Sequence, residues 1–445
     1  MNVVEGAFRK WSPFFEAGTW KYAMYFSKDI VFGCILLIPA RSLRSPAVSL
    51  FTTWFIVGGL LFGAGALISS LNGLNPVGAL LTARACLLLP LLVLLAVPRL
   101  AGLRLHWIGW VLVGLTFLNF GLGLQQNRLP VDHILNRYAD AGMQVVATQT
   151  GVRAAGTFAY ITGMALLSTV GVWTGMVLLG LKGGRWQHTA GWAAILAGFG
   201  CGLVSISRAP LVIGALMFGV WMLSSRTGLS VVTRSLAAGV GLVGLLVMLQ
   251  FTGTFAQLGR GVMQRQELGA DTFEERAFGQ FGQTMKALAS HPFGNGFGTE
   301  QVAGNYYTTG VMQFTTYEEP LPRLVMETGF LGLIGYLVIC AGAILSLQTA
   351  KRHAAGNETK SVLLATQLLL ISMFYGSVLF NHTASAFAWL IFAAVMAAVV
   401  HQTPLVQPDP IRKDRRHARP RRWGKSPGTT ATQNNDETGA NSAQT

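Results

Sequence analysis

Long apolar runs, separated by short polar connections, make up most of this chain. Of its 445 residues, 51% are hydrophobic and only 11% are charged, and the mean hydropathy is +0.47. So few charged side chains cannot cover the surface of a soluble protein of this length, and most of that surface must therefore face lipid. We predict an all-α, polytopic helical membrane protein.

Apolar stretches of bilayer length predict about 11–12 membrane spans. We place these spans at residues 22–40, 47–69, 76–97, 107–124, 154–181, 190–206, 209–224, 235–250, 321–347, 362–380 and 385–400. They follow an N-terminal segment, 1–21, and form two groups, 22–252 and 321–401, on either side of one large polar loop at 253–320. Residues 402–445 have no apolar periodicity, which predicts a disordered tail.

The connections between the spans alternate in charge, and this pattern orients the chain. Every second connection is short and basic, such as those that contain Arg41 and Arg44 or Arg99 and Arg104. The positive-inside rule assigns these connections to the cytoplasm, so the large loop is expected to be periplasmic. The basic tail is then cytoplasmic. Its Lys and Arg residues could suggest a nucleic-acid partner, but a basic cluster just after a last span is explained more simply by contact with anionic lipids, and we expect no nucleic-acid partner.

The large loop contains one clear helix signal. Thr272 and Glu275 form a capping box, and apolar residues then recur at helical spacing, which predicts an amphipathic helix at about 273–290. His291 ends this helix, and the GNGFG sequence that follows predicts a tight turn passing close to another segment. This turn lacks the strand and helix that flank a nucleotide-binding loop.

Four arginines are candidates for binding an anion. Arg208, in SISRAP at the end of the sixth span, is a costly charge that favours an anionic partner, although it can also reach lipid headgroups. Arg84 lies deeper, in the third span, and either serves the same purpose or pairs with Asp29 of the first span. Arg153 and Arg276, at the start of the fifth span and on the predicted helix, are weaker candidates.

Paired carboxylates close the large loop. Glu318 and Glu319 precede the ninth span, and Arg323 follows one turn later. Two interpretations stay open: the acids stabilise the start of the helix, or one of them is a base whose pKa its neighbours tune. His291 and His382 fall on the same side of the membrane, but no metal-ligand spacing appears, and we expect no metal site.

Five short motifs occur in order between Arg153 and Tyr336. They are RAAGTF at Arg153, SR at Ser207 and Arg208, EER ending at Arg276, HPFGNGFG from His291, and ETGFLGLIGYL from Glu327. This series resembles the O-antigen ligase and polymerase superfamily. The resemblance implies a glycosyltransferase of the bacterial inner membrane that uses no nucleotide, metal or other cofactor. Its implied partners are an undecaprenyl-diphosphate-linked glycan, a glycan or lipid acceptor, and membrane lipids.

The resemblance also implies roles for individual residues. Arg208 and Arg276 match the diphosphate-binding arginines of the family, and we assign Glu318 as the base for the attacking hydroxyl. These three are the expected catalytic residues. The expected substrate-binding residues are Arg84, Arg153, Glu319, Arg323 and His291.

The acid pair departs from the family pattern, because ligases of this family typically carry a His-Asn pair at this position. A carboxylate can still take a proton from a hydroxyl, but polymerisation, or transfer to another acceptor, fits the substitution as well as ligation does. The alternative from another class is a transporter of an anionic envelope precursor, since intramembrane arginines also line transport pathways.

Overall fold

The computed structural model describes residues 2–11, 27–41, 45–138, 147–148, 151–224, 270–301, 316, 319–375 and 382–402. Within these ranges the chain is helical, apart from connections and one two-residue strand pair. The elements are α1 (Asn2–Trp11), α3 (Ser27–Leu36), α4 (Pro46–Ser70), α5 (Pro76–Ala83), η2 (Arg84–Leu88), α6 (Leu89–Ala96), α7 (Leu105–Arg128), η3 (Ile134–Asn136), β1 (Ala147–Thr148), β2 (Gly151–Val152), α8 (Ile161–Gly180), α9 (Arg185–Val204), α10 (Arg208–Ser224), α13 (Ala270–Ser290), α15 (Pro320–His353), α16 (Asn357–Tyr375) and α17 (His382–Gln402).

Five of the described helices are long and apolar enough to cross a membrane. They are Pro46–Ser70, Pro76–Ala96, Leu105–Arg128, Ile161–Gly180 and Pro320–His353. The helices α10 and α17 add the shorter apolar stretches Ala209–Ser224 and Ser385–Val400. The all-α membrane fold is therefore confirmed, whereas the expected span at 235–250 lies outside the described residues and the total number of spans stays a prediction.

Several expected spans begin or end a few residues away from the observed helices, and two of these differences have a local physical reason. The helix α3 stops at Leu36, short of the expected end at residue 40, since Pro39 follows and disfavours helix in the residue before it. The helix α8 begins at Ile161 rather than at residue 154. The residues before it form a turn instead, in which the backbone N–H and the hydroxyl of Thr157 both donate to Asn119 Oδ1 of α7, at 2.8 and 2.9 Å.

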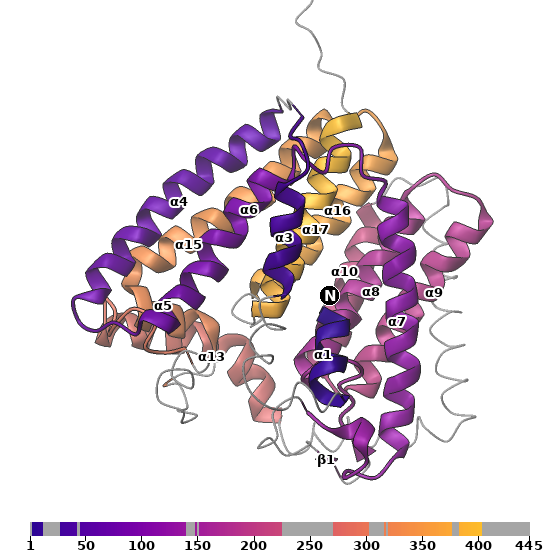
Figure 1. The fold of residues 1–445 in the computed structure, drawn as a ribbon, viewed down its shortest axis with the longest axis horizontal. Coiled ribbons are helices and arrows are strands. Elements are labelled where there is room, and N and C mark those ends of the chain that lie inside the picture. Colours follow the sequence, from indigo (N-terminus) through magenta and orange to yellow (C-terminus); the bar gives the residue numbers. More distant parts are fainter. Residues whose placement is uncertain are drawn as a thin grey trace, which may run out of the picture. The chain divides into compact units, whose positions relative to one another are not determined.

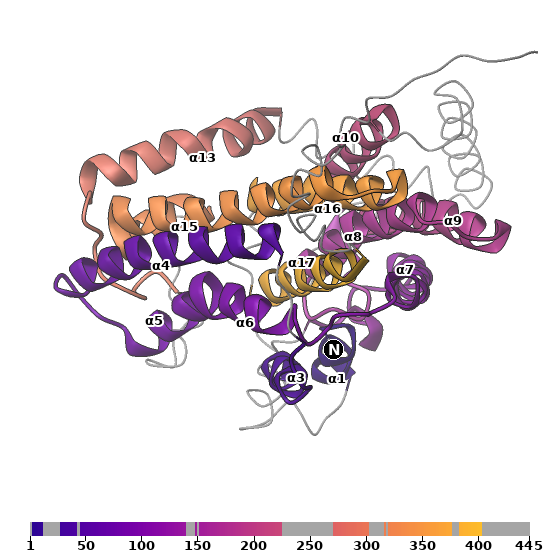
Figure 2. The same cartoon turned by 90° about the horizontal axis from the view of Figure 1, so that it is seen from above.

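The helices α4 and α15 lie side by side (Figures 1 and 2), and glycines bring their backbones together. A Cβ atom on Gly65 would lie 2.5 Å from the Gly332 nitrogen, and one on Gly58 would lie 2.5 Å from the Gly335 oxygen. Small residues allow this approach in membrane helices, where dispersion contacts hold helices together. Two glycines of the ETGFLGLIGYL motif thus have a packing role.

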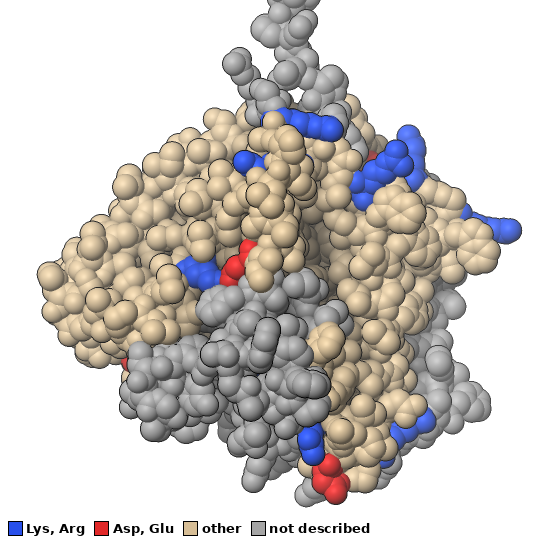
Figure 3. All heavy atoms as spheres, viewed as in Figure 1, with Lys and Arg blue, Asp and Glu red and all other residues tan. Residues whose placement is uncertain are grey.

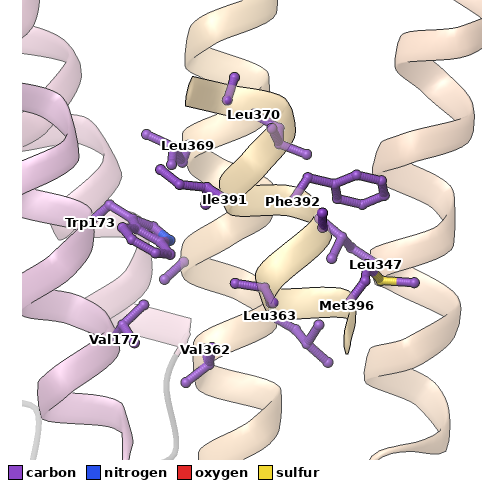
Figure 4. Packing of buried hydrophobic residues seen from close by; sticks show 14 of the residues in the cluster. Trp173, Val177, Leu347, Val362, Leu363, Leu369, Leu370, Ile391, Phe392 and Met396 are labelled. Atoms are coloured by element: carbon purple, nitrogen blue, oxygen red, sulfur yellow. The ribbon is translucent and has the colours of Figure 1, made fainter. Parts of the chain in front are cut away.

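The largest apolar core lies where α8, α15, α16 and α17 meet (Figure 4). Two tryptophans there satisfy their buried indole N–H groups across helices: Trp173 Nε1 donates to Thr366 Oγ1, and Trp221 Nε1 donates to the Ser361 carbonyl, each at 3.2 Å. On the face shown in Figure 3, charged side chains form only a few small groups among the described residues. A surface with so few charged groups suits a lipid environment.

Candidate functional site

The HPFGNGFG segment after α13 packs against the connection between α4 and α5. The Phe297 N–H donates to the Gly73 carbonyl at 2.9 Å, and the Asn75 N–H donates to the Phe297 carbonyl at 3.0 Å. The Asn72 side chain also donates to the Gly294 carbonyl, at 2.8 Å. The predicted close approach of this turn is confirmed, and its partner is the chain that leads into α5.

Glycine is required in this turn by backbone conformation and by space. Gly294 and Gly298 have φ values of +83° and +80°, which L side chains rarely adopt. A Cβ atom on Gly78, in the first turn of α5, would clash with the Gly298 carbonyl oxygen. The turn therefore fixes where α5 begins.

The same segment pairs with a kink in α15 at Gly329, where φ is +65° and ψ is −167°. Such a kink frees backbone groups that a continuous helix would pair. The Met326 carbonyl accepts a hydrogen bond from the Asn295 N–H at 2.6 Å, and the Phe330 N–H donates to the Pro292 carbonyl at 2.9 Å. Two motifs of the predicted series, HPFGNGFG and ETGFLG, thus complete each other's hydrogen bonding.

A fully buried carboxylate, Glu327, lies on α15 just before this kink. Its Oε2 atom accepts a 2.5 Å hydrogen bond from the Thr82 hydroxyl of α5, and Thr82 in turn accepts from Gln301 Nε2 at 2.7 Å. Among the described residues, Glu327 Oε1 has no hydrogen-bond partner. The charges of Arg323 and Glu300 act on this carboxyl group.

Glu300, 7% exposed, holds the chain that leads to the acid pair. Its Oε2 atom accepts from the Thr316 N–H and its Oε1 atom accepts from the Thr316 hydroxyl, both at 2.8 Å. Hydrogen bonds to an ionised carboxylate are among the stronger ones in proteins. Because both oxygens are used, Glu300 fixes the position and the orientation of Thr316.

Glu319 is the residue that precedes the first turn of α15, but its side chain makes no capping hydrogen bond to that helix. Glu319 therefore does not cap α15 through a hydrogen bond, whereas a charge near the start of the helix is still favourable, so both interpretations of the acid pair stay open. The Arg323 N–H donates to the Glu319 carbonyl at 3.3 Å, so Arg323 lies in the first turn of α15, where its charge acts on Glu327.

Arg153 forms hydrogen bonds to the turn that leads into α10. Its Nε atom donates to the Ser205 carbonyl at 3.1 Å and its Nη2 atom donates to the Ser207 hydroxyl at 3.0 Å. Between these serines, Ile206 has a φ of +50°, a strained conformation for a β-branched residue. The RAAGTF motif thus supports the strained turn that ends at Arg208, the first residue of α10.

The helix α1 is attached to the RAAGTF motif by a buried lysine. Lys10 Nζ donates to the Gly156 carbonyl at 2.9 Å and lies 5.2 Å from the centre of the Trp11 ring. Burial lowers the pKa of Lys10 from the ordinary 10.5 to about 7.

The depressed pKa of Lys10 predicts a pH dependence for the docking of α1. Between pH 7 and 10.5, Lys10 is protonated when α1 is undocked and neutral when it is docked. The equilibrium constant for docking therefore rises with pH, by up to about tenfold per pH unit. Hydrogen exchange of α1 should therefore be slower at pH 9 than at pH 6.5, after correction for the intrinsic rate. The Lys10→Met variant should lose this dependence, and a variant that keeps it would contradict the prediction.

Arg84 pairs with Asp29, as one of the two interpretations of this residue required. Its Nε atom lies 3.0 Å from both carboxylate oxygens and its Nη2 atom lies 2.8 Å from Oδ1, in a bidentate arrangement between η2 and α3. The Arg84 side chain is 4% exposed and the Asp29 side chain 26%. Pairing with Asp29 therefore accounts for an arginine inside the third span.

Breaking the Arg84–Asp29 pair should destabilise the protein. Asp29→Leu leaves a buried guanidinium without this partner, and we expect a loss of about 3 kcal/mol in thermal unfolding in detergent. The Asp29→Leu/Arg84→Met double variant should recover most of it. If the double variant instead loses as much stability as the single variants Asp29→Leu and Arg84→Met lose together, the pairing is contradicted. As a control, Glu358→Gln, which removes a surface pair with the exposed Lys182, should cost no more than about 1 kcal/mol.

The remaining predicted residues are placed only in part. His291 follows α13, is half-buried, and has its Nδ1 atom 3.0 Å from the Ser290 hydroxyl, so the structure shows it as a helix-ending residue. Arg208 and Arg276 lie on α10 and α13, but their side chains are outside the described residues, as is all of Glu318. Their convergence stays a prediction.

Two acids of this region, Glu300 and Glu327, were missed as candidates by the sequence analysis. A signal existed for Glu327, which is the only acidic residue between Pro320 and Asn357 and so the only one inside the ninth apolar run. Glu300 gave no such signal, because its partner Thr316 is distant in sequence. Within the described residues, no group of three or more His, Cys, Asp or Glu side chains could hold a metal ion.

Comparison with known proteins adds no relative to this picture. No family model matches the chain, and no curated protein sequence matches it.

Proposed function

We propose that this protein is an integral membrane glycan transferase, which moves a sugar chain from an undecaprenyl diphosphate donor to an acceptor hydroxyl. One observation supports this proposal most. The HPFGNGFG segment hydrogen-bonds to the kinked ETGFLG segment near the start of α15, and the Glu300–Thr316 contact lies next to this pairing. These are motifs of the ordered series and the chain next to the acid pair. In this proposal the site faces the periplasm of a bacterial inner membrane.

The chemistry of the donor explains the residue types. The acceptor oxygen attacks the anomeric carbon, the bond from that carbon to the diphosphate oxygen breaks, and the diphosphate leaves with the electron pair. Arg208 and Arg276 stabilise the growing negative charge through bidentate hydrogen bonds. Glu318 takes the proton of the hydroxyl. A single displacement of this kind inverts the anomeric configuration, which NMR of the product can check.

The acid pair at Glu318 and Glu319 supports a polymerase as a second candidate within the same chemistry, because ligases of the similar family typically carry His-Asn there. Deleting the gene and analysing the lipid-linked glycans separates the two. Accumulation of full-length chains on the carrier indicates a ligase, and accumulation of single repeat units indicates a polymerase. Unchanged lipid-linked glycans would contradict both.

A transporter of an anionic precursor remains the alternative from another class. Proteoliposomes that contain the purified protein and a lipid-linked glycan distinguish the two classes, because a transferase consumes the donor and a transporter moves it unchanged. We expect consumption of the donor when an acceptor is present. A transport pathway would be lined by intramembrane arginines such as Arg84 and Arg208, and the pairing of Arg84 with Asp29 gives Arg84 a structural role instead.

A further inference from the structure

The dipeptide Glu300–Gln301, just after the glycine turn, joins three segments of the chain. Gln301 donates to Thr82 of α5, which donates to Glu327 of α15. Glu300 accepts both hydrogen bonds of Thr316. One dipeptide thus connects two helices to the segment that carries the acid pair.

Because this dipeptide is buried, losing any of its hydrogen bonds is costly. Glu300 and Gln301 are 7% and 3% exposed, and Thr82 and Glu327 are fully buried. A buried polar group that loses its partner is costly, so each member of the set is held where its partner lies. Thr316 itself is exposed, and the Glu300 carboxylate is what ties it to this buried set.

We propose that Glu300 is a positioning residue for the base of the glycan transfer, an inference that rests on the proposed function. Thr316 precedes Glu318 by two residues, so fixing its N–H and hydroxyl limits the positions that the Glu318 carboxylate can reach. Catalytic groups must be held closely to their working geometry, and a small misplacement lowers the rate far more than it lowers substrate binding. Glu300 acts through Thr316 and does not touch the substrate.

Substitutions at both ends of the contact test this role. Thr316→Val removes one hydrogen bond and Thr316→Ser keeps both, whereas Glu300→Gln leaves a single acceptor oxygen. We expect kcat to fall about 10- to 100-fold in Thr316→Val and Glu300→Gln, with the KM for the donor unchanged, and to stay near the wild-type value in Thr316→Ser. The double variant should lose less than the sum of the two single losses, because both changes weaken the same pair of hydrogen bonds.

A second readout does not depend on activity. Hydrogen exchange of peptides that cover Thr316 should be faster in Glu300→Gln than in the wild type, and unchanged in the control Glu358→Gln, whose acid lies in a surface pair. Unchanged exchange at Thr316, or additive losses of kcat in the double variant, would overturn the positioning role.

Failure of the positioning role and failure of the proposed function give different results. If Glu318→Gln is inactive while Glu300→Gln and Thr316→Val keep full activity, the positioning role fails and the base assignment stands. If the wild type transfers no glycan from any lipid-linked donor, the proposed function fails, and faster exchange at Thr316 in Glu300→Gln would still establish the contact. Should Glu300→Gln not fold, the matched pair Thr316→Val and Thr316→Ser decides the question.

Discussion

If the proposed function is correct, we expect glycan transfer to fall by about 100-fold or more when Glu318 is replaced by Gln, whereas binding of the lipid-linked donor should stay close to that of the wild type. The amide cannot accept the proton of the attacking hydroxyl, and a general base typically contributes 10²–10⁴-fold to the rate. Donor affinity is expected to persist because, in the proposed mechanism, the arginines and not the acid bind the diphosphate. Single-turnover transfer with purified protein, together with a donor-binding titration, measures both quantities.

Two controls make this result specific to Glu318. Glu358→Gln makes the same chemical change in a surface pair with Lys182 and should leave transfer unchanged. Glu319→Gln tests the adjacent acid, which precedes α15 without capping it, and should retain more activity than Glu318→Gln. Near-normal transfer by Glu318→Gln would exclude Glu318 as the base. If Glu319→Gln is inactive at the same time, Glu319 is the base instead.

The second large effect is expected at the kink of α15. In Gly329→Ala the new Cβ atom would lie 2.7 Å from the Phe293 carbonyl carbon and from the Pro292 oxygen, at a φ of +65°. Strain of roughly 1–3 kcal/mol, in a backbone conformation that is almost confined to glycine, and the loss of two hydrogen bonds worth about 1 kcal/mol each predict a destabilisation of about 3 kcal/mol or more. Thermal unfolding in detergent and protease cleavage within 292–301 report the loss.

Gly63→Ala on α4 is the matched control. A Cβ atom there meets nothing within 4 Å, so the substitution should be neutral or should stabilise the helix by up to about 1 kcal/mol. If Gly329→Ala is as stable as Gly63→Ala and the 292–301 segment stays protected, the kink does not hold that segment in place.

The membrane helices were largely predictable because their signals are local. The runs expected at 47–69 and 76–97 appear as Pro46–Ser70 and Pro76–Ala96, each beginning with a proline, which is favourable in the first turn of a helix. The start of α8 was not predictable in this way. The turn before it depends on Asn119, which belongs to a different helix. Tertiary contacts of this kind override an apolar run.

The candidate site was predictable only in outline. A glycine-rich sequence predicts a tight turn, but not that the turn completes the backbone hydrogen bonds of a kink at Gly329 in another motif. A lone intramembrane Arg84 left two interpretations open until Asp29 was seen beside it. The contact between Glu300 and Thr316 joins residues with no periodic relation, so no sequence pattern could indicate it.

In the proposed mechanism, Arg208, Arg276 and Glu318 converge at one face of the membrane to bind a lipid diphosphate. Thiol cross-linking tests this convergence, between cysteines placed at 208 and 318, and at 276 and 318, in a variant without the four native cysteines. We predict that a short, membrane-impermeant bifunctional reagent added from the periplasmic side links both pairs, and that a lipid-linked donor slows the reaction. Labelling of position 208 from the cytoplasmic side alone, or no link between either pair, would show that these three residues do not form one site.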